Sequence, residues 1–278
     1  MEKHPLLFRY PGGKFYALDV LRSFWSQIVH DEYREPFVGG GSVFFNKPKV
    51  NRNWLNDIDD ELITTYKAIS VKETRQRLLK KLETQEASKT HWKRVFATKP
   101  KSDFDKAFKY YYLNRTSFSG KLMSAAWGYR EKRSLPPSRW HERINPCGNK
   151  LEDVKLTNLD FRKVIKESSS RKVFMFVDPP YYSPAKRKHY RFGLDEEDHI
   201  DLSNLLKITK HSFVLTYDDC QDVRLLYKWA YVYPISFFYR VDNSNIQNGK
   251  RRSGCELVIS NIKFDQCKLD TFKQSELF

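Results

Sequence analysis

The chain has 278 residues, with 50 Lys or Arg against 34 Asp or Glu, so its formal net charge is +16. Hydrophobic residues make up 40% and aromatic residues 15% of the sequence, which argues against a largely disordered chain. No apolar run reaches the roughly 20 residues that a membrane-spanning helix needs, and the N-terminus lacks the apolar stretch of a secretory signal. We therefore expect a cytoplasmic protein whose basic balance favours a polyanionic partner, with nucleic acid ahead of an anionic membrane.

Neither disulfides nor a metal site is expected. The four cysteines contain no CxxC pair, and a cytosolic chain of this size needs no covalent staples. The acids Asp59, Asp60 and Glu61 follow one another directly, which is typical of the first turn of a helix rather than of an organised set of metal ligands.

Short apolar runs that end in acidic or glycine-rich turns alternate with helical patterns along the chain. This alternation predicts an α/β fold with a mainly parallel sheet, which binds ligands outside the carboxyl ends of its strands. The helical pattern after the second run extends to residue 83. The runs cover residues 34–38, 51–57, 154–160, 172–178, 212–219 and 255–261, with another inside 229–239, and the polar residues that end four of them are Glu35, Asp57, Asp160 and Asp178.

Residues 84–150 interrupt the alternation and carry 15 Lys or Arg against 5 Asp or Glu. We predict a basic helical insertion there, with residues 1–83 and 151–278 forming the other domain. Cations can neutralise phosphates, and interleaved rings can stack on bases. Rings at helical spacing are expected in the core instead, namely Phe104, Phe108, Tyr111 and Tyr112. Smaller basic clusters occur near residues 186–191 and 250–252.

Two glycine-rich turns are candidates for ligand binding. In residues 36–44 (PFVGGGSVF), the third small position of a dinucleotide fingerprint falls on Phe44, so a cofactor without a pyrophosphate fits better. In residues 9–14 (RYPGGK), the spacing of a phosphate-binding P-loop is absent, which disfavours a nucleotide triphosphatase. Lys14 could face a carboxylate or be an ordinary surface lysine. Asp57, past the second strand, could accept both hydroxyls of a ribose.

The string DPPYY at residues 178–182 is the most informative part of the sequence. Two prolines cannot continue a central strand, and they fix an extended turn after the apolar run. The Asp178 carboxylate, the Pro179 carbonyl and the Tyr181 ring would then suit the exocyclic amine of a planar base. The two acceptors would take its hydrogens, and the ring would stack on the base.

An ordered set of strings spanning roughly residues 6 to 262 resembles the Dam-like (D12-class) DNA adenine-N6 methyltransferases. The resemblance implies a class I methyltransferase (Rossmann-like) fold, with a mainly parallel seven-stranded sheet and a helical target-recognition insertion. It also implies S-adenosyl-L-methionine as cofactor and double-stranded DNA as partner, and it leaves room for a cognate restriction endonuclease. The strings are RYPGGK, EPFVGGGSVFF, LNDIDDELI, YYLNRTSFSGK, TNLDF, VDPPYY, FVLTYDD and CELVISN.

The resemblance also assigns roles to residues of this chain. Members that methylate GATC usually have Tyr-Asn where this chain has Phe118-Ser119, and an arginine slightly downstream, so a GATC target does not follow. The implied catalytic residues are Asp178, Pro179, Pro180 and Tyr181. The implied cofactor contacts are Tyr10, Lys14, Phe37, Gly39, Gly41, Asp57, Asp160, Phe161 and Asp178. The resemblance implies DNA contacts in the segment that contains Asn114, Arg115, Phe118, Ser119 and Lys121. From their charge, we also expect DNA contacts by basic residues of the insertion and of two loops, namely Arg130, Lys186, Arg187, Lys188 and Arg251.

Other interpretations remain open from the residues alone. A cytosine-N4 methyltransferase would modify the same kind of amine, and a catalytically silent DNA-binding module or an RNA substrate would also fit the charge. A cytosine-C5 enzyme is disfavoured, because Cys147 lies in a predicted loop without an activating partner. Tyr190 could cover a flipped base or just pack, as could Phe192. We expect a structural role for His199 and helix capping for Asp218 and Asp219.

Overall fold

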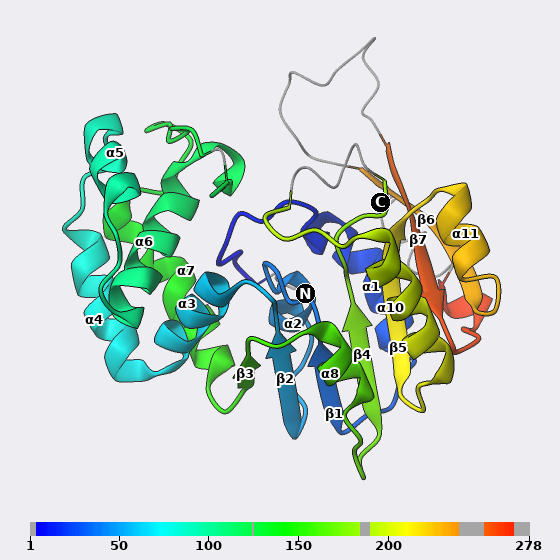
Figure 1. Ribbon diagram of the computed structural model, residues 1–278. Helices are drawn as coiled ribbons and strands as arrows, with labels where there is room; N and C mark the ends of the chain where they lie inside the picture. Colours follow the sequence, from blue (N-terminus) through cyan, green and yellow to red (C-terminus); the bar gives the residue numbers. More distant parts are fainter. Residues whose placement is uncertain (1–3, 124, 184–189, 239–252, 270–278) are drawn as a thin grey trace.

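A seven-stranded sheet forms the centre of the protein (Figure 1). The computed structural model describes residues 4–123, 125–183, 190–238 and 253–269. The strand order is β3-β2-β1-β4-β5-β7-β6; β1 to β5 run parallel and β7 lies antiparallel between β5 and β6. The predicted α/β fold with a mainly parallel seven-stranded sheet is therefore confirmed. The strands are β1 (Glu32–Glu35), β2 (Arg52–Asn56), β3 (Lys155–Thr157), β4 (Val173–Val177), β5 (Ser212–Asp218), β6 (Tyr231–Phe238) and β7 (Ser253–Ser260).

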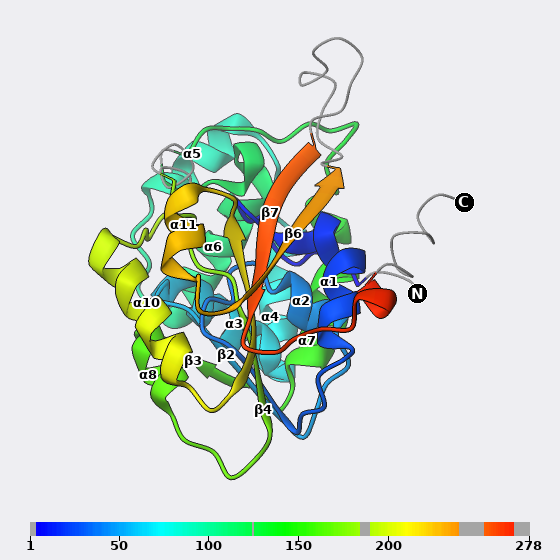
Figure 2. The same cartoon turned by 90° about the vertical axis from the view of Figure 1, so that its right-hand side faces the viewer.

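Helices cover both faces of the sheet, which explains why its central strand is apolar throughout. In β4, Phe174 and Phe176 pack into one core while Met175 packs into the other, as the two-residue period of a strand requires. Figure 2 separates the two layers. One layer contains α8 (Phe161–Lys166), α10 (Glu196–Ile208) and α11 (Gln221–Leu226), and the other contains η1 (Lys14–Ala17), α1 (Leu18–Trp25) and α2 (Ser42–Asn46).

A lobe of helices lies beside the sheet (Figure 1). Its residues follow β2 and precede β3 in the sequence, which is where the insertion was predicted. Its core contains Tyr111, Tyr112 and Trp140, which are fully buried, so the rings at helical spacing are packing residues. The lobe comprises α3 (Asp60–Ser70), α4 (Lys72–Glu83), α5 (Lys89–Ala97), α6 (Asp103–Thr116), η2 (Phe118–Gly120), η3 (Pro137–Arg139) and α7 (His141–Leu151).

The structure differs from the sequence prediction at two points in this lobe. The helical pattern up to residue 83 breaks at Val71, whose backbone is extended. The Arg75 side chain spans the break, because it donates to the Ile69 carbonyl and to Asn149 of α7. Helix α4 therefore packs with the lobe, although it precedes residue 84; the division into two domains stays a prediction. Cys147 lies inside α7 and is fully buried, so its placement in a loop was wrong.

Strand β1 buries two opposite charges that the fold must keep together. The Arg34 Nε donates to Glu32 Oε1 at 2.7 Å, and Arg34 Nη1 donates to the Val164 and Glu167 carbonyls at 3.0 and 2.6 Å. Both side chains are fully buried. This ion pair fastens the loop after α8 to the middle of the sheet.

We expect Arg34→Ala to lower the free energy of unfolding by about 3 kcal/mol, because it leaves Glu32 buried without its main partner. Urea titration followed by circular dichroism measures this quantity. Arg52→Ala is the matched control, since Arg52 lies 3.9 Å from the same carboxylate but is half-exposed. Its loss should cost less than about 1 kcal/mol, and equal losses in the two variants would contradict the assignment.

Candidate active site

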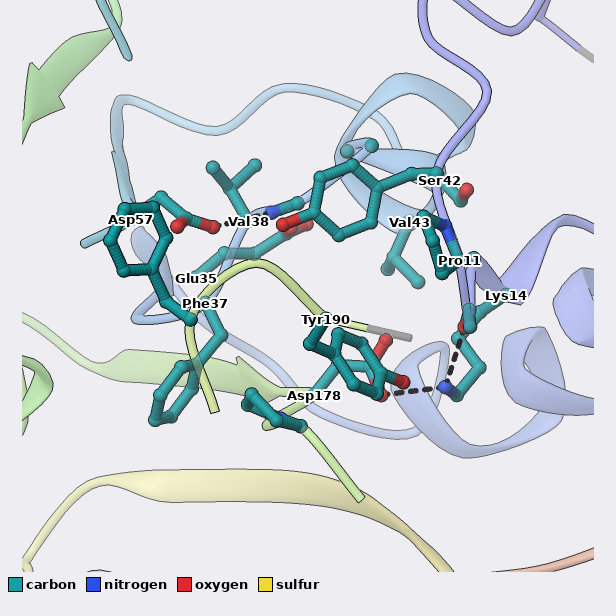
Figure 3. Close-up of a pocket in the computed structure, with 18 of the residues that line it drawn as sticks. Pro11, Lys14, Glu35, Phe37, Val38, Ser42, Val43, Asp57, Asp178 and Tyr190 are labelled. Carbon is teal, nitrogen blue, oxygen red and sulfur yellow. Dashed lines mark hydrogen bonds and ion pairs between the residues drawn. The ribbon is translucent and has the colours of Figure 1, made fainter. Parts of the chain in front are cut away.

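Three carboxylates from three parallel strands surround one cavity (Figure 3). Glu35 ends β1, Asp57 follows β2 and Asp178 follows β4. Strands β1 and β4 are neighbours in the sheet although they are distant in sequence, so the strand order reverses between them. The cavity thus lies at the position where doubly wound sheets bind ligands.

The turn after β1 requires glycine because another residue packs directly on it. Gly39 and Gly41 have φ angles of 45° and 66°. A Cβ atom on Gly39 would lie 2.9 Å from the Tyr10 ring. The glycine-rich turn therefore forms one wall of the cavity, with Tyr10 lying against it.

Two acids of the cavity have their pKa raised by burial. Burial raises the pKa of Asp57 to about 6, even though its oxygens accept from the Gly39 and Asp59 amides at 2.9 and 3.0 Å. Burial raises the pKa of Glu35 to about 8, against the opposing effect of hydrogen bonds from the Tyr33 hydroxyl and the Phe44 amide. Burial therefore favours the neutral form of both acids, more strongly for Glu35 than for Asp57.

The third carboxylate, Asp178, is held by a buried cation. The Lys14 Nζ lies 2.6 Å from Asp178 Oδ1 and donates to the Gly12 carbonyl at 2.9 Å (Figure 3). Thr216 Oγ1 donates to the same Oδ1 at 2.7 Å. Burial opposes the charge of Lys14, but Asp178 and the more distant Glu256 together raise the pKa of Lys14 well above its ordinary value. The two contacts fix Asp178 through Oδ1 and leave Oδ2 without a partner among the described residues.

The DPPYY turn is held from β5, and this overturns one prediction. Asp218 accepts from the Tyr182 and Ser183 amides at 3.0 and 3.2 Å, so it fastens the turn instead of capping a helix. Asp219 does not cap α11 either, because it pairs with Arg224 at 2.6 Å. The capping prediction was therefore wrong for both acids.

Only part of the turn reaches the cavity. Asp178 and Pro180 line it, whereas Pro179 and Tyr181 do not. The Tyr181 ring is buried, its hydroxyl donates to Glu256 on β7, and the Tyr190 ring meets it edge-on at 5.9 Å between centroids. The predicted catalytic set is therefore brought together, but its aromatic ring lies behind Tyr190.

Some of the predicted cofactor contacts line the cavity and others do not. The structure does not bring Asp160 and Phe161 to the cavity. Asp160 caps α8 and pairs with Arg162 at 3.1 Å, and the Phe161 ring packs behind Phe37 at 5.1 Å between centroids. The sequence placed them correctly after a strand, but β3 is the edge strand of the sheet, and Phe37 lines the cavity where Phe161 does not. The residues that do line the cavity are Tyr10, Lys14, Phe37, Gly39, Gly41, Asp57 and Asp178.

A second, larger cleft shares the turn of residues 10–13 as a wall with the cavity. No Asp or Glu occurs among the described residues that line it. Phe118 lies at its edge with 54% of its surface exposed, and η2 bends at Ser119, whose φ is 53°. We call this surface the basic cleft. Its cations are Arg9, Lys121, Arg130 and Arg133, and its rings include Phe15, Tyr16 and Phe118.

Two predicted DNA contacts lie beneath the basic cleft rather than on it. Asn114 is buried and uses its amide to bind the Arg9 backbone at 2.9 and 2.8 Å and the Gly120 carbonyl at 3.1 Å. Arg115 is also buried, and burial lowers its pKa to about 10. Direct contact of Arg115 with DNA is therefore not supported, whereas Asn114 positions Arg9 and also lines a third space on the side of the helical lobe. Four further candidates, Lys186, Arg187, Lys188 and Arg251, lie outside the described residues.

Sequence reasoning missed two features around the cavity, the buried acid Glu256 and the pairing of Arg191, and it left the role of Tyr190 open. Glu256 could have been found, because an acid inside the apolar string CELVIS needs a buried partner. Tyr190 lines the cavity beside Asp178, and Arg191 pairs with Asp59 at 3.2 Å and Glu61 at 2.5 Å. No local sequence pattern predicts that Arg191 pairs with Asp59 and Glu61. The acids expected at the start of a helix do lie there, with Asp59 as the N-cap of α3 and Asp60 and Glu61 in its first turn. His199, expected to be a structural or surface residue, is buried and contacts the Tyr217 hydroxyl.

The described residues show no metal-binding cluster, no activated thiol at Cys147 and no membrane-spanning helix. Among the described residues, no three His, Cys, Asp or Glu side chains gather in a way that could hold a metal ion. Burial raises the pKa of Cys147 to about 12, which leaves its thiol a poor nucleophile. In the part of the chain that the structure describes, every helix is too short or too polar to cross a membrane.

The Glu35 carboxyl makes folding depend on pH. Its pKa is higher in the folded than in the unfolded chain, so stability falls as pH rises from about 4.5 through about 8. Glu35→Gln keeps an acceptor oxygen for Tyr33 and Phe44 but cannot ionise. We expect the variant to exceed the parent in unfolding free energy by about 2 kcal/mol or more at pH 9, and by much less near pH 5. Urea unfolding at both pH values checks this, and a pH-independent difference would contradict it.

Comparison with known proteins agrees with this geometry. A family model described as D12 class N6 adenine-specific DNA methyltransferase matches residues 10–240. The chain is 28% identical over 232 residues to the type II methyltransferase M.CviBI of Paramecium bursaria Chlorella virus NC1A, covering 80% of this chain and 85% of that protein. It is 24% identical over 295 residues to the type II methyltransferase M.MjaIII of Methanocaldococcus jannaschii, covering 94% and 100%.

A shorter match covers 43% of this chain and 44% of the DNA adenine methylase of Escherichia coli (strain K12), with 31% identity over 125 residues. The family match spans most of the sequence and includes Glu35, Asp57 and Asp178, the three acids that surround the cavity. The chain therefore belongs to the D12 class N6 adenine-specific DNA methyltransferase family and methylates adenine in DNA.

Proposed function

We propose that the protein is a site-specific DNA methyltransferase that transfers a methyl group from S-adenosyl-L-methionine to N6 of an adenine flipped out of duplex DNA. The observation that carries this proposal is the arrangement of two neighbouring spaces of opposite charge. A carboxylate-lined cavity contains Asp178, and the basic cleft lies on the other side of the turn of residues 10–13.

The cavity fits the cofactor by charge and by shape. The carboxylates of Asp57 and Asp178 face a sulfonium and an ammonium group better than they would face a phosphate, whereas burial, which raises the pKa of Glu35 to about 8, keeps that acid mainly protonated near neutral pH. Asp57 has both carboxylate oxygens fixed by backbone amides, so its remaining lone pairs can accept the two hydroxyls of a ribose. The glycine-rich turn allows a ligand to approach the backbone closely. Phe37 supplies an apolar wall.

The basic cleft fits the phosphates of a DNA duplex. Its lining carries four cations and no acid among the described residues, and exposed rings stand at its edges. Cations supply the salt-dependent part of DNA affinity, and an exposed ring such as Phe118 can contact bases. The helical lobe, which we propose as the target-recognition region, supplies Phe118, Lys121, Arg130 and Arg133.

The chemistry follows from the surroundings of Asp178. The adenine N6 lone pair is delocalised into the ring, so N6 is a poor nucleophile until acceptors draw on its hydrogens. Lys14 and Thr216 fix the Oδ1 atom, so Oδ2 can accept one N6 hydrogen. We propose the Pro179 carbonyl as acceptor of the other, which requires the base to reach past the lining of the cavity, since Pro179 does not itself line it. When bound, the cofactor supplies an electrophilic methyl group on a sulfonium. Preorganised acceptors and alignment then provide the rate gain, without a covalent enzyme intermediate.

Two relatives named as type II methyltransferases support a restriction–modification setting. We propose that a cognate restriction endonuclease acts on the same DNA site. Sequencing that detects modified bases, applied to DNA from cells that express the protein, would give the methylated base and the recognition site together. Methylated cytosine in place of N6-methyladenine would overturn the proposed product.

We expect Asp178→Ala to lose roughly 10²-fold or more in turnover while it keeps DNA affinity, because one preorganised acceptor is removed from the reacting amine. Methyl transfer in single turnover measures the first quantity, and a gel-shift titration measures the second. Asp219→Ala is the matched control, because Asp219 also ends a strand near the site but pairs with Arg224 on the surface. Near-normal turnover of Asp178→Ala would refute the role.

Affinity for DNA should fall steeply with salt, since the basic cleft neutralises several phosphates. Replacing both Arg130 and Arg133 by Gln should reduce the slope of log K against log salt by about 2, roughly one unit for each contact. Fluorescence anisotropy with a labelled duplex at several salt concentrations checks this. An unchanged slope in the double variant would place the DNA elsewhere on the protein.

A further inference from the structure

Tyr190 stands between the cavity and a third space on the side of the helical lobe. The third space is lined by rings and by Asp59, Asn114 and Arg191, and it shares Tyr10, Pro11 and Tyr190 with the cavity. Asp178 belongs to the cavity alone. A base arriving from the lobe must therefore pass this shared wall to reach Asp178. The remaining lining residues of the third space are Tyr110, Gly120, Lys121, Leu122 and Met123.

The Tyr190 side chain packs against Gly12 through its hydroxyl and against Tyr181 through its ring. Its hydroxyl lies against Gly12, where an added Cβ would collide with it and where φ is 73°. Its ring covers the Tyr181 ring edge-on, and Figure 3 shows it directly beside Asp178 and Lys14. Tyr190 thus lies beside Asp178 and meets the Tyr181 ring at nearly a right angle.

An ion-pair latch holds the segment that carries Tyr190. Arg191 binds Asp59 and Glu61 at the first turn of α3, at 3.2 and 2.5 Å. Phe192, Gly193 and Leu194 then line the cavity before Asp195 caps α10. Residues 190–194 therefore form an outer wall of the cavity that is fastened at α3 and at α10. Arg191 does not line the cavity, so the latch can change without altering the walls around a cofactor.

We propose that Tyr190 is a plug: in the absence of DNA its ring fills the seat of the target adenine, and the extruded base must displace it. This inference rests on the proposed function, because it needs a flipped adenine beside Asp178. Displacement uncovers the Tyr181 ring, which then becomes available to stack on the base. The plug keeps water away from the buried Lys14–Asp178 pair until a base replaces it. Because the base binds only when the seat is open, the apparent affinity for a target base equals the intrinsic affinity multiplied by the fraction of molecules with an open seat.

The test compares two duplexes that contain the recognition site. One carries the target adenine, and the other carries an abasic residue in its place, so no base enters the seat. We expect Tyr190→Ala to bind the adenine duplex about fivefold more tightly than the parent, since the displacement step is removed. Affinity for the abasic duplex should stay unchanged. Both are measured by anisotropy with the full chain and a saturating non-reactive cofactor analogue, sinefungin.

A second variant, Arg191→Gln, tests the same inference without removing the Tyr190 ring, because Tyr190→Ala could also disturb the local packing. Arg191→Gln breaks the latch but keeps the Tyr190 ring, and it should shift affinity in the same direction by a smaller factor. Arg224→Gln is the matched control, because Arg224 pairs with Asp219 away from the cavity, and it should leave both affinities unchanged.

The outcomes separate this inference from the proposed function. If the parent protein methylates adenine but Tyr190→Ala binds the adenine duplex equally or less tightly, the plug is refuted and Tyr190 acts as a stacking partner or a packing residue. Equal tightening on both duplexes also refutes the plug, since it would then report a general change in DNA contact. If the parent protein methylates no adenine, the proposed function itself fails.

Discussion

The buried ion pair between Lys14 and Asp178 is the constraint on which the site depends. It joins the N-terminal turn of residues 9–14 to the end of β4, two segments that share no strand pairing. Breaking such a pair by removing one partner leaves an uncompensated charge in a buried place, which is strongly unfavourable. The pair therefore fixes the turn that separates the cavity from the basic cleft, and it aims the other Asp178 oxygen at one position.

Opposite charges are segregated on the two sides of that turn. The cavity collects carboxylates from three strand ends, whereas the basic cleft collects cations from the turn itself and from the helical lobe. Segregation of this kind destabilises the folded protein somewhat, because like charges lie close together. It also explains a specific property: a cationic donor and a polyanionic acceptor are each attracted to one side of the same thin wall. The target base then reaches Asp178 past the wall that the cavity shares with the third space, beside Tyr190.

The sequence predicted the parts of the site that are local and left out those that depend on tertiary contact. Residues that end central strands, such as Glu35, Asp57 and Asp178, were found because polar groups after apolar runs meet at one edge of a parallel sheet. Asp160 satisfied the same pattern but lies at an edge strand, and strand order cannot be read from one sequence. Asn114 and Arg115 were assigned to the surface by resemblance, yet their helix turns them inward. Arg191 could be seen as basic, but its pairing with α3 could not.

The Tyr181 ring of the DPPYY turn is covered in this structure and cannot stack on a base until the cover moves. Its hydroxyl is bound by Glu256 and its ring is covered by Tyr190, so the aromatic part of the DPPYY turn is rigid before any ligand arrives. A rigid ring costs little to order when a base stacks on it, because its side-chain freedom is already lost. The covering ring, by contrast, belongs to a short segment outside the helices that is fastened by the Arg191 ion pairs at α3 and by the start of α10. The fixed partner and the removable cover therefore divide two tasks that a single tyrosine could not perform together, namely preorganisation of the seat and protection of its charges.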